Sequence, residues 1–401
     1  MTLSEELVWR GFTSETTVTD LSTLDEGPRS YYHGFDPSAD SLQIGNLAAL
    51  MMDKVFNKHG YKPYILVGGA TGMIGDPKDN EERQLKALEE INHNKECIVR
   101  EFRQVLGDDI TVVDNYDWFK DIKFLPFLRE VGKQFSMTQL LDRQFVKNRI
   151  GEGGAGISYA EFSYTLIQGY DFLHLYRTYG IDMQLCGADQ FGNCVSGMHL
   201  IKRLEGVDVD IYANPLILDP TGRKFGKSEG NAIFLSAERT SPYDFYQFWL
   251  NLPDEGLEGY VKIYTELDKP AVDELMTRHA ENPSERIAQK TLAYEVTKLI
   301  HGVEIADSVV KITTVLFGDH NISELSETDL DLLAKFTPVA AKDGSLIDAL
   351  VESELAKSKS DARQLITSGA ISVNNEKITE DRNLNELALV RKGKNKFLLV
   401  R

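Results

Sequence analysis

Short apolar runs alternate with segments of helical period along roughly the first 225 residues. The runs Tyr31–Phe35, Tyr64–Val67 and Ile110–Val113 have the length and composition of buried strands. The segments between them repeat apolar positions every three or four residues, as amphipathic helices do. Strands that alternate with helices favour an α/β fold in which helices cover an open parallel sheet.

The pattern becomes helical throughout between residue 241 and about residue 317. In the run 284–302 the period is 3.6, and we expect Ser284 to cap this helix with Glu285 in its first turn. The polar stretch that follows resembles a linker with short helical pieces.

The last 57 residues, 345–401, show an α+β pattern. A helix is predicted over Lys359–Thr367 with Gly369 as its stop, followed by a strand, a turn at Asn374-Asn375 and a second strand. Because 401 residues exceed one ordinary core, two or three domains are expected. The predicted boundaries are an α/β domain at 1–229, a helical domain at 230–325, a linker at 326–344 and the α+β domain at 345–401.

Composition narrows the class of protein. Hydrophobic residues make up 42% and charged residues 26%, which is typical of a soluble globular enzyme. The N-terminus MTLSEELVWR is acidic and no run reaches the about 18 apolar residues of a membrane helix, so we expect neither a signal peptide nor a membrane span. The spacing of Cys97, Cys186 and Cys194 suggests no disulfide framework or CxxC site, which favours the cytoplasm.

The net charge of −18 argues against nucleic-acid binding over the whole surface. The charge is uneven, however, because residues 345–401 hold ten lysines and arginines against eight acidic residues. The C-terminal end is therefore distinct from the acidic remainder.

The turn VGGATGMIGDP, residues 67–77, follows a predicted strand and repeats glycine at every third position. A dinucleotide-binding turn should be followed about 20 residues later by an acidic residue at the end of a second strand. Residues 85–104 have a helical pattern instead, so an NAD(P) site is disfavoured. The alternative is that the glycines let a strand, a turn and a ligand approach closely, with Asp76 at the end of the turn.

Two further stretches carry candidate chemistry. In YYHGFDPSADSLQIGNL, residues 31–47, Gln43 and Asn46 share one face at a helix N-terminus, and Gly45 leaves the backbone bare for a flat ring. In GRKFGKSEG, residues 222–230, two lysines flank a glycine in a loop that could close over a polyphosphate. An ordinary capped helix and a solvated basic loop are the respective alternatives.

Taken in order along the chain, these motifs resemble the bacterial tyrosyl-tRNA synthetases, a family of class I aminoacyl-tRNA synthetases. LQIGN stands at the HIGH signature of the family and KFGKS at its KMSKS signature, and the resemblance covers essentially the whole chain. Further segments match in order and spacing, namely GFDPSADSL, VGGATGMIGDP, NYDW, EFSYTLIQGYDF, GADQFGN and SPYDFYQFW. The resemblance implies a Rossmann-like catalytic domain with a dimerising insertion at about 116–160, an anticodon-side helical domain and an S4-like RNA-binding domain.

The resemblance also implies a reaction. Tyrosine and ATP would give tyrosyl-adenylate and pyrophosphate, and tyrosine would then pass to the 3′ end of tRNA(Tyr) for protein synthesis. ATP would be a substrate with Mg²⁺ on its phosphates, without a prosthetic group or a protein metal site. The implied partners are tyrosine, ATP, tRNA(Tyr) and a second copy of the chain, with no membrane.

The helix EFSYTLIQGYDF supports this resemblance. Tyr164, Gln168 and Asp171 fall on one stripe, and a buried amide and carboxylate require polar partners that a tyrosine ligand would supply. By resemblance, the phenol is bound by Tyr32 and Asp171, the ammonium group by Asp76, Tyr164 and Gln168, with Asn115 and Gln184 as further tyrosine-site residues. The residues implied to act on the phosphates are Gln43, Asn46, Lys224, Lys227 and Ser228, and those implied to bind ATP are His33, Gly34, Asp36, Ser38, Gly45, Gly187, Asp189, Gln190, Lys224, Phe225 and Lys227.

The chain departs from the family pattern at three places, of which the mildest is Phe191 in place of the usual tryptophan of GADQFGN. Gln43 replaces the first histidine of the HIGH signature and cannot carry a positive charge. The loop PKDNEER after Asp76 is one residue short, so Lys78 or Arg83 could stand in for the lysine of the family.

The segment SKSDARQLITSGAISVNNEKI resembles an S4-like domain, and RKGKNKFLLVR contains five cations and no acid. The predicted RNA-binding residues are Lys359, Arg363, Lys377, Arg391, Lys392, Lys394 and Lys396, with surface solubility as the alternative. Two other functions stay open. One is a tryptophanyl-tRNA synthetase, although Asp171 with Tyr32 favours the phenol of tyrosine over the indole of tryptophan. The other is an RNA-binding protein whose synthetase body is catalytically idle.

Overall fold

The structure is a computed structural model that describes residues 1–77, 85–141, 144–151, 156–219, 221–223, 225, 227–228, 231–318 and 320–401. Of residues 139, 144, 145, 227, 228 and 231 it describes the main chain alone. The chain forms two compact units, one of residues 1–240 and 252–292, the other of residues 241–251 and 293–401. Among the described residues, no helix combines the length and the apolar character needed to cross a bilayer.

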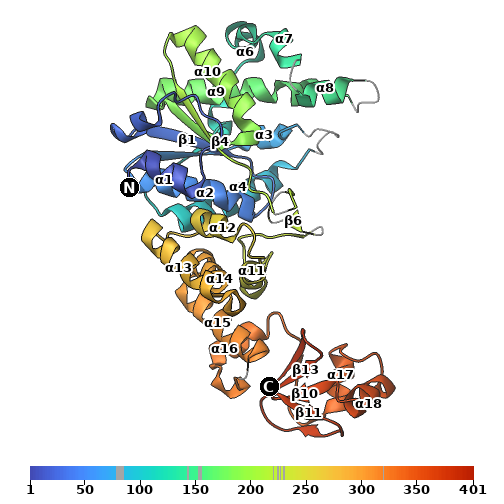
Figure 1. Ribbon diagram of the computed structural model, residues 1–401. Helices are drawn as coiled ribbons and strands as arrows, with labels where there is room; N and C mark the ends of the chain where they lie inside the picture. Colours follow the sequence, from blue (N-terminus) through green and yellow to red (C-terminus); the bar gives the residue numbers. More distant parts are fainter. Residues whose placement is uncertain are drawn as a thin grey trace. The chain divides into compact units, whose positions relative to one another are not determined.

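The first unit is built on a parallel sheet with the strand order β3-β2-β1-β4-β5 (Figure 1). Its strands are β1 (Ser30–Phe35), β2 (Lys62–Val67), β3 (Thr111–Asp114), β4 (Met183–Gly187) and β5 (Asp210–Asn214). The order reverses on the two sides of β1, and ligands of such sheets bind at the carboxyl ends of the strands beside this reversal. The expected α/β fold and its first three strands are confirmed.

Helices cover both faces of this sheet (Figure 1). Tyr31 points to one face, where its hydroxyl donates to the carbonyl of Asp53 in α2 (Ile44–Lys58) at 3.1 Å. Tyr32, the next residue, points to the other face, where its ring lies 5.2 Å from that of Phe172 in α9 (Tyr159–Tyr179). Because successive side chains of a strand alternate, these two contacts assign α2 and α9 to opposite layers. Helix α4 (Leu88–Leu106) packs against α2, and α10 (Phe191–Glu205) packs against α9.

The other helices begin and end as follows: α1 (Leu3–Arg10), α3 (Gly69–Ile74), α5 (Tyr116–Phe119), α6 (Phe124–Glu130), α7 (Met137–Leu141), α8 (Gln144–Ile150), α12 (Leu257–Tyr264), α13 (Lys269–Glu281) and α14 (Ile287–His301). The expected cap of α14 was wrong. Ser284 lies in a 3-10 turn, and Arg286, with a left-handed φ of 52°, separates that turn from the helix. The propensity of serine for caps therefore located the start of this helix two residues too early.

The second unit contains α11 (Pro242–Leu250), α15 (Val303–Phe317), α16 (Glu327–Leu333), α17 (Leu346–Glu352) and α18 (Lys359–Thr367). Its five-stranded sheet has the order β11-β10-β13-β14-β8, built from β8 (Val339–Ala340), β10 (Ile371–Val373), β11 (Glu376–Ile378), β13 (Ala388–Lys392) and β14 (Lys396–Val400). Short pairs are formed by β9 (Gly344–Ser345) with β12 (Asn383–Leu384), and in the first unit by β6 (Lys227–Ser228) with β7 (Asn231–Ala232).

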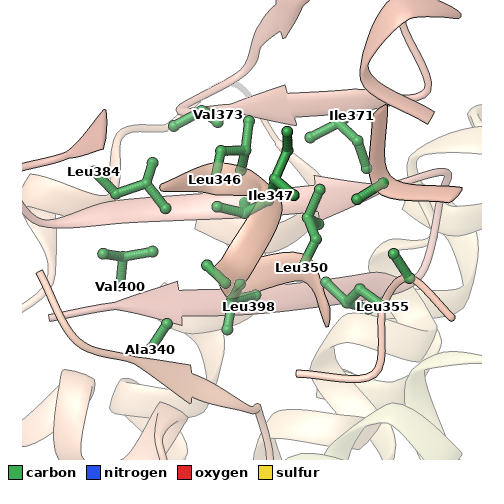
Figure 2. Packing of buried hydrophobic residues seen from close by; sticks show 14 of the residues in the cluster. Ala340, Leu346, Ile347, Leu350, Leu355, Ile371, Val373, Leu384, Leu398 and Val400 are labelled. Carbon is green, nitrogen blue, oxygen red and sulfur yellow. The ribbon is translucent and has the colours of Figure 1, made fainter. Parts of the chain in front are cut away.

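The C-terminal sequence pattern is confirmed in detail. Helix α18 has the predicted bounds, and Gly369 follows it with a left-handed φ of 67°. Asn374 and Asn375 form the turn between β10 and β11 with φ values of 50° and 68°, a conformation that asparagine tolerates better than most residues. Apolar side chains of α17 such as Leu346 and Leu350 pack on those of the sheet (Figure 2).

Candidate functional site

A cavity of about 410 Å³ opens at the carboxyl ends of β1, β4 and β5. The start of α2, the glycine turn and the first half of α9 complete its wall. The predicted site residues that line it are Tyr32, His33, Gly34, Asp36, Ser38, Gln43, Gly45, Asn46, Asp76, Tyr164, Gln168, Asp171, Gln184, Gly187, Asp189, Gln190 and Phe225. Positions that are scattered over nearly 200 residues thus share one cavity.

Six further predicted or considered residues are not among these lining residues. Lys78, Arg83 and Lys224 lie outside the described residues. Lys227 and Ser228 are described only as the main chain of β6. Asn115 lies behind the cavity wall, fully buried, and acts on residues that line it.

The glycine turn forms the short helix α3, and its N-terminus is occupied by the protein itself. The main-chain nitrogen of Gly69 donates to Asp114 Oδ1 at 3.1 Å, and that of Ala70 donates to Asn115 Oδ1 at 2.7 Å. A Cβ atom on Gly69 would lie 2.2 Å from Asp114 Oδ1, so this position requires glycine. The glycines therefore serve close packing of β2, α3 and the end of β3, because the helix N-terminus that a pyrophosphate would need already binds side chains.

One end of the cavity holds a buried carboxylate. Asp171 in α9 is 2% exposed; its Oδ2 accepts from Asn115 Nδ2 at 3.1 Å and its Oδ1 accepts from Trp118 Nε1 at 3.0 Å. Burial raises the pKa of Asp171 well above its usual value, although both hydrogen bonds oppose this shift. The hydroxyl of Tyr32 is also buried and has no hydrogen-bond partner among the described residues. This end of the cavity therefore presents a hydroxyl and an acceptor to a polar group of a ligand.

A second cluster lies on the same cavity wall. The hydroxyl of Tyr164 donates to Asp36 Oδ2 at 2.8 Å, so its oxygen can act towards a ligand as an acceptor. Asp76 Oδ2 accepts from Gln190 Nε2 at 2.9 Å, and Gln168 Oε1 is buried without a partner in the part of the chain that the structure describes. A tyrosine oxygen, a carboxylate and an amide oxygen form a set suited to the three N–H donors of an ammonium group.

The two signature motifs are neighbours in space. The main-chain nitrogen of Ile44 donates to the carbonyl of Ile233 at 3.1 Å, and that of Leu235 donates to the carbonyl of Leu42 at 2.9 Å. The residues after KFGKS are thereby paired with the beginning of LQIGN. This pairing holds the C-terminal end of the basic loop beside the start of α2.

A buried carboxylate supports this junction from α4. Glu101 accepts from the main-chain nitrogen of Leu42 and from the hydroxyl of Ser41, both at 2.7 Å. Ser41 Oγ in turn accepts from the main-chain nitrogen of Ser236 at 2.9 Å. Burial raises the pKa of Glu101, which these two hydrogen bonds partly counteract.

Gln43 and Asn46 both line the cavity from the start of α2, where Gln43 is the N-cap residue and the side chain of Asn46 caps it. Asn46 Oδ1 accepts from the main-chain nitrogen of Gln43 at 3.0 Å, which directs the Nδ2 group of the same amide away from this bond. Apart from its chain neighbours and the backbone of its own helix, no described atom lies within 4 Å of a Cβ built on Gly45, so its backbone is open to a ligand. His33 is oriented by α2, because its Nδ1 lies 3.0 Å from Asp53 Oδ2.

Sequence reasoning missed three residues of this site. Trp118 bonds Asp171, Thr71 donates to Asp36 Oδ1 at 2.7 Å, and Asn214 lines the cavity from β5. Trp118 and Thr71 fall within the quoted motifs NYDW and VGGATGMIGDP, so the motifs contained the signal although the residues were not selected. Asn214 lies outside every quoted motif, and only its burial in the folded chain distinguishes it.

The predicted RNA-binding cations lie in the C-terminal unit. Arg363, Lys377, Lys394 and Lys396 are exposed. Lys359 pairs with Asp348 Oδ1 at 2.6 Å. Lys392 Nζ donates to the carbonyl of Leu355 at 2.6 Å and Arg391 Nε to that of Gly393 at 3.0 Å, so these two cations also stabilise the fold.

Two family descriptions match the chain. The family described as tRNA synthetases class I (W and Y) matches residues 24–318. The C-terminal domain described as that of Tyrosine--tRNA ligase, SYY-like, matches residues 333–400. Together with the parallel sheet and the cavity at its carboxyl edge, these matches define a class I tRNA synthetase.

Individual relatives narrow this class. The chain is 40% identical to a tyrosine–tRNA ligase of Streptococcus thermophilus over 99% of each chain, and 40% identical to one of Bacteroides fragilis over 100% of this chain and 99% of the other. It is also similar to the crystal structure of a C-terminally truncated mitochondrial tyrosyl-tRNA synthetase from Aspergillus nidulans, with a TM-score of 0.70, 28% identity and coverage of 79% of this chain and 94% of the other. The chain belongs to the tyrosine–tRNA ligase family, whose members are ATP-dependent ligases. The resemblance inferred from the motifs is confirmed.

Proposed function

We propose that the cavity at the carboxyl edge of the sheet binds L-tyrosine and ATP and forms tyrosyl-adenylate, which then esterifies the 3′ end of tRNA(Tyr). The observation that carries this assignment is that the buried Tyr32 hydroxyl, which has no partner among the described residues, and the buried Asp171 carboxylate line one cavity. A phenol hydroxyl donates one hydrogen bond and accepts another, so it satisfies both groups. An indole or a plain phenyl ring does not.

The amino group of tyrosine would bind to the second cluster. Asp76 supplies a carboxylate, Tyr164 an oxygen whose proton is directed to Asp36, and Gln168 an amide oxygen. Fixing both ends of the amino acid leaves its carboxylate directed at the nucleotide. Gln184, whose Oε1 is buried without a partner among the described residues, supports the same pocket.

The first step needs no nucleophile from the protein. A carboxylate oxygen of tyrosine forms a bond to the α-phosphorus of ATP while the bond from that phosphorus to the bridging oxygen breaks, and pyrophosphate leaves with the electron pair. Catalysis then depends on positioning and on stabilising the charge of pyrophosphate. We assign the stabilisation of that charge to Gln43 and Asn46 at the start of α2 and to Lys224, Lys227 and Ser228 of the basic loop. Asp189 and His33 are assigned to the ribose of ATP.

Mg²⁺ would enter on the phosphates of ATP. Among the described residues, no three histidine, cysteine or acidic side chains are grouped to hold a metal ion. Mg²⁺ is commonly bound by substrate phosphates and only one or two carboxylates, which fits a cavity lined by several separate acids.

A second copy of the chain would cover the insertion at about 116–160. Large apolar side chains of this segment and its edges are exposed, namely Tyr116, Phe124, Leu125, Met137, Leu141, Ile150 and Tyr159. Leu125 is 75% exposed and Phe124 62%, which is costly in water for a monomer. Light scattering should report a dimer, and Leu125→Asp should shift it to the monomer. We place the enzyme in the cytoplasm, where its tRNA substrate is found.

Tyrosine-dependent ATP–pyrophosphate exchange tests the proposal. Exchange with tyrosine, and neither with tryptophan nor with phenylalanine at the same concentration, is the expected result, followed by charging of tRNA(Tyr). Exchange with tryptophan would reassign the pocket. No exchange with any amino acid, together with intact tRNA binding, would identify an idle body with an RNA-binding tail.

A further inference from the structure

Asn214 is a buried amide at the carboxyl end of the edge strand β5. It pairs in register with Gly187 at the end of β4, and its side chain lines the cavity. The residue is 5% exposed, so water reaches little of it. No motif or family resemblance had singled it out.

The amide has one satisfied end and one unsatisfied end. Nδ2 donates to the carbonyl of Pro215 at 3.1 Å, which identifies the nitrogen and leaves the oxygen on the other side. Oδ1 is buried and has no hydrogen-bond partner in the described ranges. Buried amide oxygens are rarely left unpaired in folded proteins, so a donor from a ligand is the expected partner.

The surroundings of Asn214 indicate which part of ATP would supply that donor. The residues that follow it along the cavity wall are apolar, Pro215, Leu216 and Ile217, with Phe225 nearby in the same lining. Such a lining suits the faces of a flat base. Asp189, two residues after the register partner of Asn214, is the side chain assigned to the ribose.

We propose that Asn214 Oδ1 accepts a hydrogen bond from the 6-amino group of adenine and so selects ATP among nucleoside triphosphates. This inference rests on the proposed function, because it assumes that ATP binds in this cavity. The ring nitrogens N1, N3 and N7 and the phosphates of ATP are acceptors, which leaves the amino group and the ribose hydroxyls as donors. Guanine and hypoxanthine carry a carbonyl at position 6, which would place two acceptors against each other.

The test compares ATP with purine riboside 5′-triphosphate, which lacks only the 6-amino group, in tyrosine-dependent adenylate formation. Wild type should show a KM for ATP about fivefold to tenfold lower than for the analogue, a range typical of one hydrogen bond. Asn214→Leu has nearly the same shape without the acceptor, and it should bring the two KM values together by raising the KM for ATP. The KM for tyrosine should not change.

Tyr212→Phe is the matched control. It removes a buried hydroxyl from the same strand, where Tyr212 contacts Thr13 rather than the cavity, and it should keep the preference of wild type. Should Asn214→Leu fail to fold, Asn214→Ala removes the acceptor with a smaller side chain and makes the same comparison.

Two results would overturn the inference. Equal discrimination by wild type and Asn214→Leu would show that the amide does not contact the base. Asn214→Leu could instead lose the preference of wild type for ATP over 2′-deoxy-ATP while its ratio of KM values for purine riboside 5′-triphosphate and ATP stays as in wild type. That result would assign the hydrogen bond to the ribose. Both differ from failure of the proposed function, in which wild type itself would show no tyrosine-dependent reaction.

Discussion

The indole Nε1 of Trp118 donates to Asp171 Oδ1 at 3.0 Å, while Asn115 Nδ2 donates to the other oxygen of the same carboxylate. Both oxygens of Asp171 are therefore held by donors. Asp171→Asn would turn an NH₂ group towards one of these donors, so it would disturb the pocket as well as the proposed phenol contact. Tyr32 has no such partner among the described residues, which makes its hydroxyl the cleaner target.

Tyr32→Phe should erode discrimination against phenylalanine. Sites that bond a substrate hydroxyl reject the analogue without it by about 10⁴ to 10⁵, a range established for tyrosine-activating enzymes of this class. Removing one of two phenol contacts should lower the ratio of kcat/KM for tyrosine over phenylalanine by about tenfold or more, mainly through loss of tyrosine activity. The ratio is measured by adenylate formation with each amino acid.

Tyr31→Phe provides the control, because its hydroxyl lies on the opposite face of β1 and donates to Asp53. Both tyrosines are fully buried neighbours, so the pair separates pocket chemistry from general loss of a hydroxyl. An unchanged ratio in Tyr32→Phe would remove this residue from the pocket.

Much of this site could be predicted because its residues lie in short motifs, within which the geometry of a single helix or turn sets their relative positions. Tyr164, Gln168 and Asp171 lie on one stripe of α9 whatever surrounds that helix. Trp118 could not be chosen in the same way, since its contact with Asp171 joins residues 53 positions apart. Glu101 could not be chosen either, because its partners Ser41 and Leu42 lie 60 and 59 positions earlier in the sequence.

The fold shows the same division. The positions of β1, β2 and β3 and of the hairpin at Asn374 follow from local pattern and local conformational preference, and they were predicted. Asn214 is an ordinary polar residue in the sequence, and its significance depends on burial beside Gly187. Burial is a property of tertiary packing, which periodicity does not report.

Gln43→Ala should lower the rate of adenylate formation at saturating substrates by about tenfold to hundredfold, as expected for a hydrogen bond to a charged group. The KM for tyrosine should stay the same, because Gln43 is assigned to phosphate and not to the amino acid. Gln43→His, which allows a positive charge, should raise the rate above that of wild type at pH 6. Pre-steady-state measurement of adenylate formation checks both. Equal losses in rate and tyrosine affinity in Gln43→Ala would contradict a role confined to the transition state.

Glu6 should make folding of the first unit sensitive to acid. Burial disfavours its charge, but hydrogen bonds from His59, Lys58 and Arg10 outweigh this and lower the pKa of Glu6 from 4.5 to about 2. A depressed carboxyl pKa stabilises the folded state above pH 4.5, and the contribution disappears as pH falls towards 2. The shift corresponds to about 3 kcal/mol at pH 7 and about half of that at pH 3.

Glu6→Gln should therefore lower the urea midpoint at pH 7, and its difference from wild type should shrink as the pH approaches 3. The exposed Glu26→Gln serves as the control and should follow wild type throughout. A difference that is constant with pH would mean that packing, and not ionisation, accounts for the role of Glu6.

Lys394 lies exposed in the turn between β13 and β14 and is one of the cations assigned to tRNA. Each phosphate contact releases counterions, so its loss should reduce the slope of log affinity against log salt by about 0.7 to 0.9. Lys394→Ala should show this smaller slope and weaker tRNA binding at low salt, while Lys394→Arg, which keeps the charge, should retain the slope of wild type. Adenylate formation should be equal in all three proteins, because Lys394 belongs to the C-terminal sheet and not to the cavity. A full slope in Lys394→Ala would mean that this lysine only keeps the surface soluble.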